Sequence, residues 1–86
     1  MITRSDVTVV ATGIGGMGSD VWHVRVGAAD FLVSAVAYPW GNGSETAVFP
    51  AGPDGKAAGC RDIVSRVGYD HEAAIADLIR WMNEQD

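Results

Sequence analysis

The chain has 86 residues, of which 48 % are hydrophobic and 20 % charged, and this balance excludes an intrinsically disordered protein. A chain of this length can build one hydrophobic core, so we expect a single domain over residues 1–86. Eleven acidic residues against six basic ones give a net charge of −5, and the basic residues are dispersed, so we expect no direct binding to nucleic acid.

The first predicted element is a strand at residues 6–12, DVTVVAT, which is rich in β-branched residues and alternates two sets of side chains. The sequence before it lacks the apolar segment of a signal peptide, and no window approaches the ~18 apolar residues of a membrane span. We therefore expect neither export nor contact with a membrane.

Residues 13–18, GIGGMG, have the G-x-G-x-x-G spacing of dinucleotide-binding loops. Such a loop binds a pyrophosphate where it joins a strand to the N-terminus of a helix. Here the residues that follow, VWHVRV at 21–26, have a strand pattern. We therefore predict a connection between two strands and no nucleotide cofactor.

Alternation along residues 21–26 places Trp22 on a buried face and His23 on a wetter one. The next strand is predicted at residues 31–38, FLVSAVAY, and it ends at Pro39 because proline cannot donate to a ladder. The short GAAD connection between these strands favours an antiparallel hairpin.

A tight turn at Asn42-Gly43 leads into a fourth short strand, ETAVF at residues 45–49, bounded by Pro50. Residues 51–59 form a loop with Pro-Asp-Gly turn chemistry. Residues 61–69, RDIVSRVGY, fit either a short helix or a strand, and we favour a strand because Gly68 would weaken a helix.

Cys60 is the one cysteine of the chain, so no internal disulfide can form and a reducing compartment is favoured. We therefore expect the protein in the cytoplasm. We interpret Cys60 itself as a structural residue.

The last predicted element is a helix capped by Asp70, with one apolar stripe at i, i+3, i+4 and i+7: Ile75, Leu78, Ile79 and Met82. Trp81 flanks the stripe, and we expect it to cover a sheet edge. Together these elements predict an α+β fold, an antiparallel sheet of four to five strands with a C-terminal helix packed on one face.

The residues that could carry catalysis do not converge in the sequence. Ser19, Asp20 and His23 suggest a hydrolase, but alternation sends Asp20 and His23 to opposite faces of one strand. His71 is expected to face water at the start of the helix, where the dipole does not favour a cation. The histidines and Cys60 do not match a zinc spacing. We therefore predict no enzyme, no catalytic residue, no metal and no cofactor.

A recognition surface remains, at the YPWGNGSE segment of residues 38–45. Aromatic side chains held beside a turn are common anchors of protein interfaces. We assign the predicted partner contact to Tyr38, Trp40, Asn42 and Glu45. The alternative is that Tyr38 and Trp40 complete the core of a small sheet.

Three segments give the chain a family resemblance: VSAV at residues 33–36, ETAVF at 45–49, and YDHEAAIADLIRW at 69–81. They resemble small proteins of phages and mobile elements from GC-rich bacteria. The resemblance covers about two-thirds of the chain, departs from the pattern in the loop at 51–59, and brings no catalytic residues.

The resemblance implies a non-enzymatic, anti-CRISPR-like function. Small, acidic, cysteine-poor phage proteins are often inhibitors that dock on a host complex. We therefore expect a protein-binding inhibitor of a host defence assembly, such as a CRISPR effector complex, acting in the host bacterial cytoplasm. The alternative is a small adaptor or structural domain, a homodimer that pairs edge strands and binds an element-encoded partner. An enzyme that uses Cys60 or His23 is a third class for testing.

Overall fold

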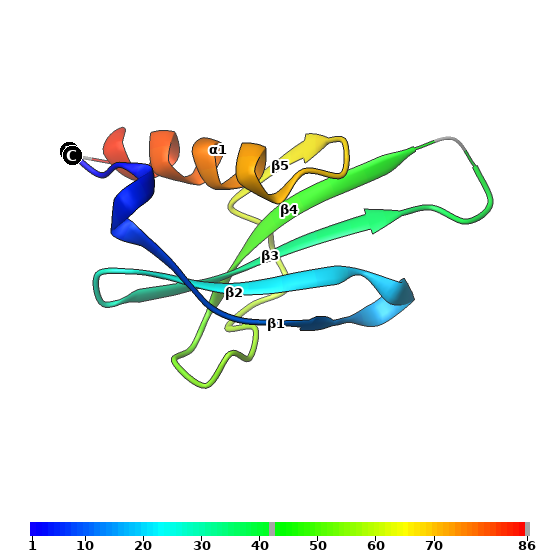
Figure 1. Cartoon of the computed structure of the whole chain (residues 1–86), viewed down its shortest axis with the longest axis horizontal. Helices are drawn as coiled ribbons and strands as arrows, with labels where there is room; N and C mark the ends of the chain where they lie inside the picture. The colour runs from blue at the N-terminus through cyan, green and yellow to red at the C-terminus, as the bar shows by residue number, and fades with distance from the viewer. Residues whose placement is uncertain (42, 86) are drawn as a thin grey trace.

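The structure is a computed structural model that describes residues 1–41 and 43–85. Within them, five strands form one antiparallel sheet in the order β1-β2-β3-β4-β5, and helix α1 lies across one face (Figure 1). The elements are β1 (Val7–Ile14), β2 (Asp20–Val26), β3 (Ala29–Ala37), β4 (Ser44–Ala51), β5 (Val64–Val67) and α1 (His71–Asn83), with short 3-10 turns at Arg4–Asp6 and Gly16–Gly18. The predicted α+β fold is confirmed.

The sheet lies in the segments where alternation predicted strands, with shifted ends. The ambiguous segment 61–69 contains β5, so the strand interpretation is confirmed for Val64–Val67. The strand predicted at 45–49 runs on through Pro50 to Ala51. The boundary placed at Pro50 was therefore wrong.

Pro50 is tolerated inside β4 because a backbone N–H at this position would not bond to either neighbouring strand. Tyr38 N–H donates to the Gly43 carbonyl at 3.0 Å, and counting along the β3–β4 register from this pair makes Phe31 and Pro50 a pair without mutual hydrogen bonds. The Pro50 nitrogen then faces the side of β5, but the paired part of β5 reaches only Val48.

The hydrophobic core lies between α1 and the sheet face that it covers. Strand alternation directs Val24 and Val33 to this face, and both are fully buried. From α1, the stripe residues Ile75 and Leu78 are also fully buried, which confirms the predicted helix face. The buried core residues are Val7, Val24, Val26, Phe31, Val33, Val48, Ala74, Ile75 and Leu78.

The start of α1 is fixed by two polar residues. Asp70 caps the helix as predicted, because its Oδ1 accepts the Ala73 N–H at 3.0 Å. Thr46, fully buried on β4, donates to the Gly68 carbonyl at 2.6 Å and accepts the Asp70 N–H at 3.0 Å. A single side chain of β4 thus holds the turn that leads into the helix.

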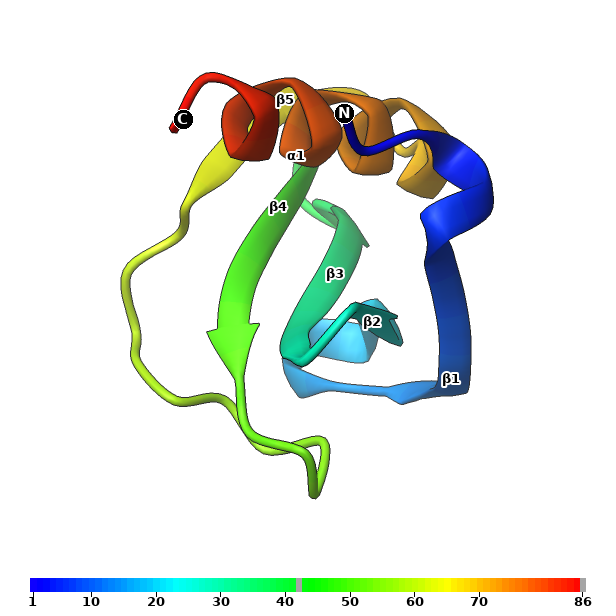
Figure 2. The same ribbon diagram turned by 90° about the vertical axis from the view of Figure 1, so that its left-hand side faces the viewer.

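The N-terminal segment is held against the same helix, as the end-on view shows (Figure 2). Ile2 N–H donates to Asn83 Oδ1 at 2.9 Å, and Asn83 Nδ2 donates back to the Ile2 carbonyl at 3.0 Å. Arg4 makes a two-point contact with Glu72 at 2.7 and 3.0 Å. These contacts set where β1 begins relative to α1.

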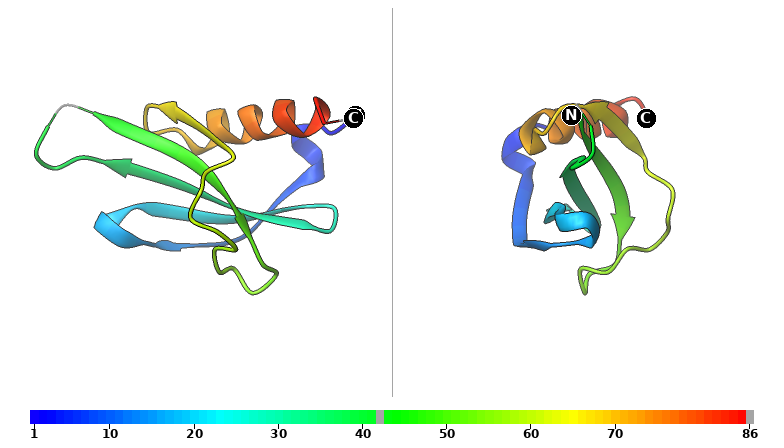
Figure 3. Two further views of the ribbon diagram at one scale, coloured as in Figure 1. Left: turned by 180° about the vertical axis from the view of Figure 1, so that it is seen from behind. Right: turned by 90° about the vertical axis from the view of Figure 1, so that its right-hand side faces the viewer.

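The face of the sheet turned away from α1, here called the outer face, is crossed in part by the segment that joins β4 to β5 (Figure 3). The segment stays attached to β4, because Ala58 N–H donates to the Pro50 carbonyl at 2.9 Å. At Gly55 it comes so close to the His23 ring that an added Cβ would lie 3.2 Å from Nδ1. The outer face is therefore partly covered.

Candidate functional site

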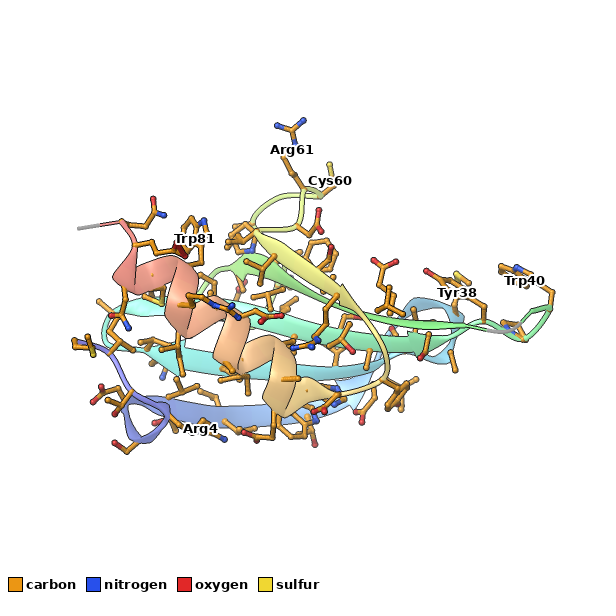
Figure 4. The ribbon with its side chains drawn as sticks, turned by 90° about the horizontal axis from the view of Figure 1, so that it is seen from above. Arg4, Tyr38, Trp40, Cys60, Arg61 and Trp81 are labelled. Carbon is orange, nitrogen blue, oxygen red and sulfur yellow. The ribbon has the colours of Figure 1, made fainter. Side chains whose placement is uncertain are left out.

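The tip of the β3–β4 hairpin carries Tyr38 and Trp40, two of the predicted partner-binding residues, at the end of the molecule remote from the chain termini (Figure 4). Trp40 is 76 % exposed, although tryptophan is a large hydrophobic residue. Its ring lies 5.9 Å from that of Tyr38, tilted by 34°. Two aromatic side chains thus form one surface at the tip.

Glu45 holds the tyrosine in place. Tyr38 Oη donates to Glu45 Oε2 at 3.2 Å, and this hydrogen bond, with the carboxylate charge, raises the pKa of the Tyr38 phenol above its usual range. Across the turn, Tyr38 N–H donates to the Gly43 carbonyl at 3.0 Å. The structure thus brings Tyr38, Trp40 and Glu45 together, while the predicted contact at Asn42 lies outside the described residues.

The alternative for this segment, completion of the core, does not fit Trp40. Tyr38 is half-buried, and neither aromatic residue belongs to the cluster between sheet and helix. Burying a large aromatic side chain stabilises a protein by about 2–3 kcal/mol. Because Trp40 is mostly exposed, the fold of this chain gains little of that free energy from it. An exposed aromatic group at a turn is typical of an interface anchor.

The glycine-rich segment is a connection between strands, as predicted. It ends β1 and leads through the turn at Gly16–Gly18 into β2, so it does not precede a helix. Gly15 is closely packed, because a Cβ there would lie 2.7 Å from Ser19 Oγ and 2.9 Å from a Val21 methyl carbon, and these side chains would have to shift. Met17 and Gly18 both have left-handed backbone angles, with φ of 60° and 70°.

The prediction that His23 faces water was wrong. His23 is 7 % exposed, because the β4–β5 segment covers it at Gly55. Its Nε2 lies 2.6 Å from Asp30 Oδ1, which also accepts from Arg25 Nε at 2.9 Å. The hydrogen bond from His23, supported by Arg25, lowers the pKa of the Asp30 carboxyl. This cluster ties β2 to β3 on the outer face.

The prediction that His71 faces water was also wrong. His71 is 7 % exposed and stacks on Trp22, with ring centroids 4.3 Å apart and planes 9° apart. Its Nε2 lies 2.8 Å from the Asp20 carbonyl oxygen. His71 therefore joins the start of α1 to β2. Its Nε2 also lies 3.8 Å from Asp20 Oδ2, so the Asp20 side chain is on the helix side and His23 is on the outer face, as the alternation predicted.

Cys60 is exposed and lies beside Arg61 on the projecting part of the β4–β5 segment (Figure 4). It lines an apolar hollow of about 420 Å³ on the outer face, together with Ser19 and Phe49. Among the described residues, no group of three or more His, Cys, Asp or Glu side chains lies close enough to hold a metal ion.

Sequence analysis missed the exposure of β1. All of its residues except Val7 are exposed, including Val10 at 42 % and Ile14 at 80 %. The sequence pointed the other way, because VTVVATGI contains neither a charge nor a proline, the residues that normally mark and protect an outer strand.

In the part of the chain that the structure describes, no helix is long and apolar enough to cross a membrane. Comparisons of the chain with models of protein families, with curated proteins and with solved structures found no match. The candidate site is therefore defined by the geometry of this chain: an exposed Trp40 held beside Tyr38, with Glu45 bonded to the tyrosine.

Proposed function

We propose that this chain is a non-enzymatic protein-binding module whose contact surface is the β3–β4 hairpin tip. One observation carries the proposal: Trp40 is 76 % exposed and rests against a tyrosine that Glu45 holds in place. Tyr38 is held by Glu45 before binding, so this tyrosine loses little conformational entropy when the tip docks. Truncating an anchor of this kind typically costs 2 kcal/mol or more, which corresponds to ~30-fold in affinity.

The partner that we propose is a host defence assembly, in the manner of anti-CRISPR proteins. Support comes from the resemblance of three segments to small phage proteins and from the net charge of −5. Defence effectors that handle nucleic acid present basic surfaces, and an acidic module is attracted to such surfaces. The carboxylate of Glu45 at the tip suits that charge.

Binding to purified CRISPR effector complexes tests this proposal. We expect Trp40→Ala to weaken the complex ~30-fold or more and Tyr38→Phe, which removes the hydrogen bond to Glu45, to weaken it less. Val10→Ala is the control, because Val10 is 42 % exposed on β1 and does not neighbour the hairpin tip. If Trp40→Ala and Val10→Ala bind alike, the hairpin tip is not the contact surface.

A small homodimeric adaptor or structural domain is the second candidate. The observation that favours it is the exposed outer strand β1, which could pair with that of a second copy. Light scattering after size exclusion separates the two: the inhibitor is expected at 9.0 kDa, and the adaptor at twice this mass.

A further inference from the structure

We propose that the outer edge of β1, at Ala11–Ile14, accepts an extended basic segment of another protein as an additional strand. One large apolar side chain of that segment is seated in a hollow on the outer face of the sheet. This contact is separate from the hairpin tip and does not depend on the function proposed for the tip, but it excludes the homodimer of the second candidate, which would occupy the same edge.

The outer edge of β1 is open to pairing. Within residues 1–41 and 43–85, no strand pairs with β1 on the side away from β2. Natural edges are usually protected by charges, prolines, bulges or short length, and β1 has eight residues with no charge and no proline. Its one protective feature is the shift of register between Val9 and Ala11, which confines regular pairing to Ala11–Ile14.

Two residues of this short stretch direct their main-chain N–H and C=O groups away from β2, toward the open edge. Gly15 N–H donates to the Ser19 carbonyl at 2.8 Å, which fixes the phase of the β1–β2 ladder. Counting back along the register, Gly13 and Ala11 bond toward β2. Thr12 and Ile14 therefore direct their N–H and C=O groups to the open side, where an added strand can bond to them.

A hollow lies on the outer face beside this edge, and we call it the edge hollow. Its volume is about 410 Å³; Ala11 and Gly13 line it on β1, Val21 and Leu32 lie beneath, and Asp54 lies in the β4–β5 segment. A Cβ built on Gly13 would meet no atom within 4 Å. The small side chains of β1 thus leave space that the chain itself does not fill.

The added strand would direct side chains to this space. Residues of an antiparallel neighbour opposite Ala11 and Gly13 would form pairs without mutual hydrogen bonds, the pairs in which side chains come closest. They would also share the outer face with Ala11 and Gly13. A leucine or phenylalanine there could reach across the two small residues into the edge hollow.

These features favour a foreign segment over a second copy of this chain. In the antiparallel β1–β1 register that pairs Ala11 with Gly13 of the second copy, only these small residues face the edge hollow, and it stays empty. Two copies that each carry a net charge of −5 would also repel each other. A basic segment is instead attracted to the chain and to the exposed Asp54 beside the hollow.

Short synthetic peptides test the inference, with NMR chemical shifts of the labelled protein as the readout. The probe alternates Thr and Val, with one central Phe and a Lys at each end. Its matched controls replace Phe by Ala, replace Lys by Glu, or methylate the main-chain nitrogens that would face β1. We expect the Phe–Lys peptide to shift the amides of Thr12 and Ile14 and to bind about tenfold more tightly than each control.

Protein variants locate the contact. Gly13→Leu fills the edge hollow and is expected to weaken binding about tenfold, since nothing lies near its Cβ in the free protein. Thr12→Pro removes an outward N–H and is expected to weaken it as well, provided that the variant stays folded by circular dichroism. Trp40→Ala and Val67→Ala should bind the peptide like the original chain, which separates this site from the hairpin tip.

Four results would overturn the inference. They are no binding of the Phe–Lys peptide up to about 1 mM, the range of weak complexes; equal binding of the N-methylated peptide; shifts that lie away from β1 and the edge hollow; and unchanged binding by Gly13→Leu. A fifth result, a dimer that protects the Thr12 and Ile14 amides without any peptide, would also overturn it, because the edge would then belong to a second copy.

Discussion

Thr46 links the sheet to the start of α1, and its replacement by valine is expected to destabilise the fold. The side chain is fully buried and makes two hydrogen bonds, to the Gly68 carbonyl at 2.6 Å and from the Asp70 N–H at 3.0 Å. Valine has nearly the same shape but can make neither bond. At about 0.5–1.5 kcal/mol for each bond, the free energy of unfolding should fall by ~1–3 kcal/mol.

Serine at the same position is the matched control. Thr46→Ser keeps the hydroxyl and removes one buried methyl group, which costs about 1 kcal/mol. If burial of apolar surface alone decided the outcome, valine would be at least as stable as threonine, and serine would be the least stable. If the hydrogen bonds decide it, valine falls at or below serine.

Thermal unfolding followed by circular dichroism measures the difference. A domain of this size loses ~4–8 °C in Tm per kcal/mol, so Thr46→Val should unfold ~4–24 °C below the original chain. A Thr46→Val variant that melts at the same temperature as the original chain would refute the argument. The two hydrogen bonds would then contribute nothing net to holding the helix.

Three further outcomes follow from the geometry. Trp40→Ala should change the free energy of unfolding by no more than ~0.5 kcal/mol in urea titration, because the side chain is 76 % exposed. A larger loss of stability would show that Trp40 contributes to the fold. Gly15→Ala places a Cβ 2.7 Å from a side-chain oxygen and should cost ~1–3 kcal/mol, whereas Gly16→Ala, with nothing within 4 Å, should be close to neutral; equal melting temperatures would contradict the packing argument. The pKa of Asp30 is lowered in the folded state, so its carboxylate stabilises the fold above the unfolded pKa of about 3.9, and this effect is lost as the pH falls through the folded pKa. Asp30→Asn should therefore lower Tm at pH 7 more than at about pH 2. The same loss of Tm at both pH values would count against this linkage.

Local pattern predicted the sheet and helix because their signals lie within a few residues. The alternation of Trp22 and His23 assigns them correctly to opposite faces of β2. The spacing of Ile75 and Leu78 identifies the buried face of α1, and Asp70 identifies its start. These features depend on periods of two and 3.6 residues, which the sequence shows directly.

The errors concern contacts between residues far apart in the chain. His23 is covered by Gly55, which is 32 positions away, and His71 stacks on Trp22, which is 49 positions away. No local pattern carries that information, so both histidines were predicted to face water. At the candidate site, the sequence suggested that Tyr38 and Trp40 lie beside a turn, but it could not separate an interface from a core.

The order of the strands bears on how the chain folds. Every ladder of the sheet joins strands that are consecutive in the sequence, so β1 to β4 can assemble one hairpin at a time without closing a long loop. The connection from Ala51 to Val64 is the longest between neighbouring strands, which makes the arrival of β5 the entropically most expensive pairing. We therefore expect β5 to join the sheet last, together with α1, the helix that directly follows it in the chain.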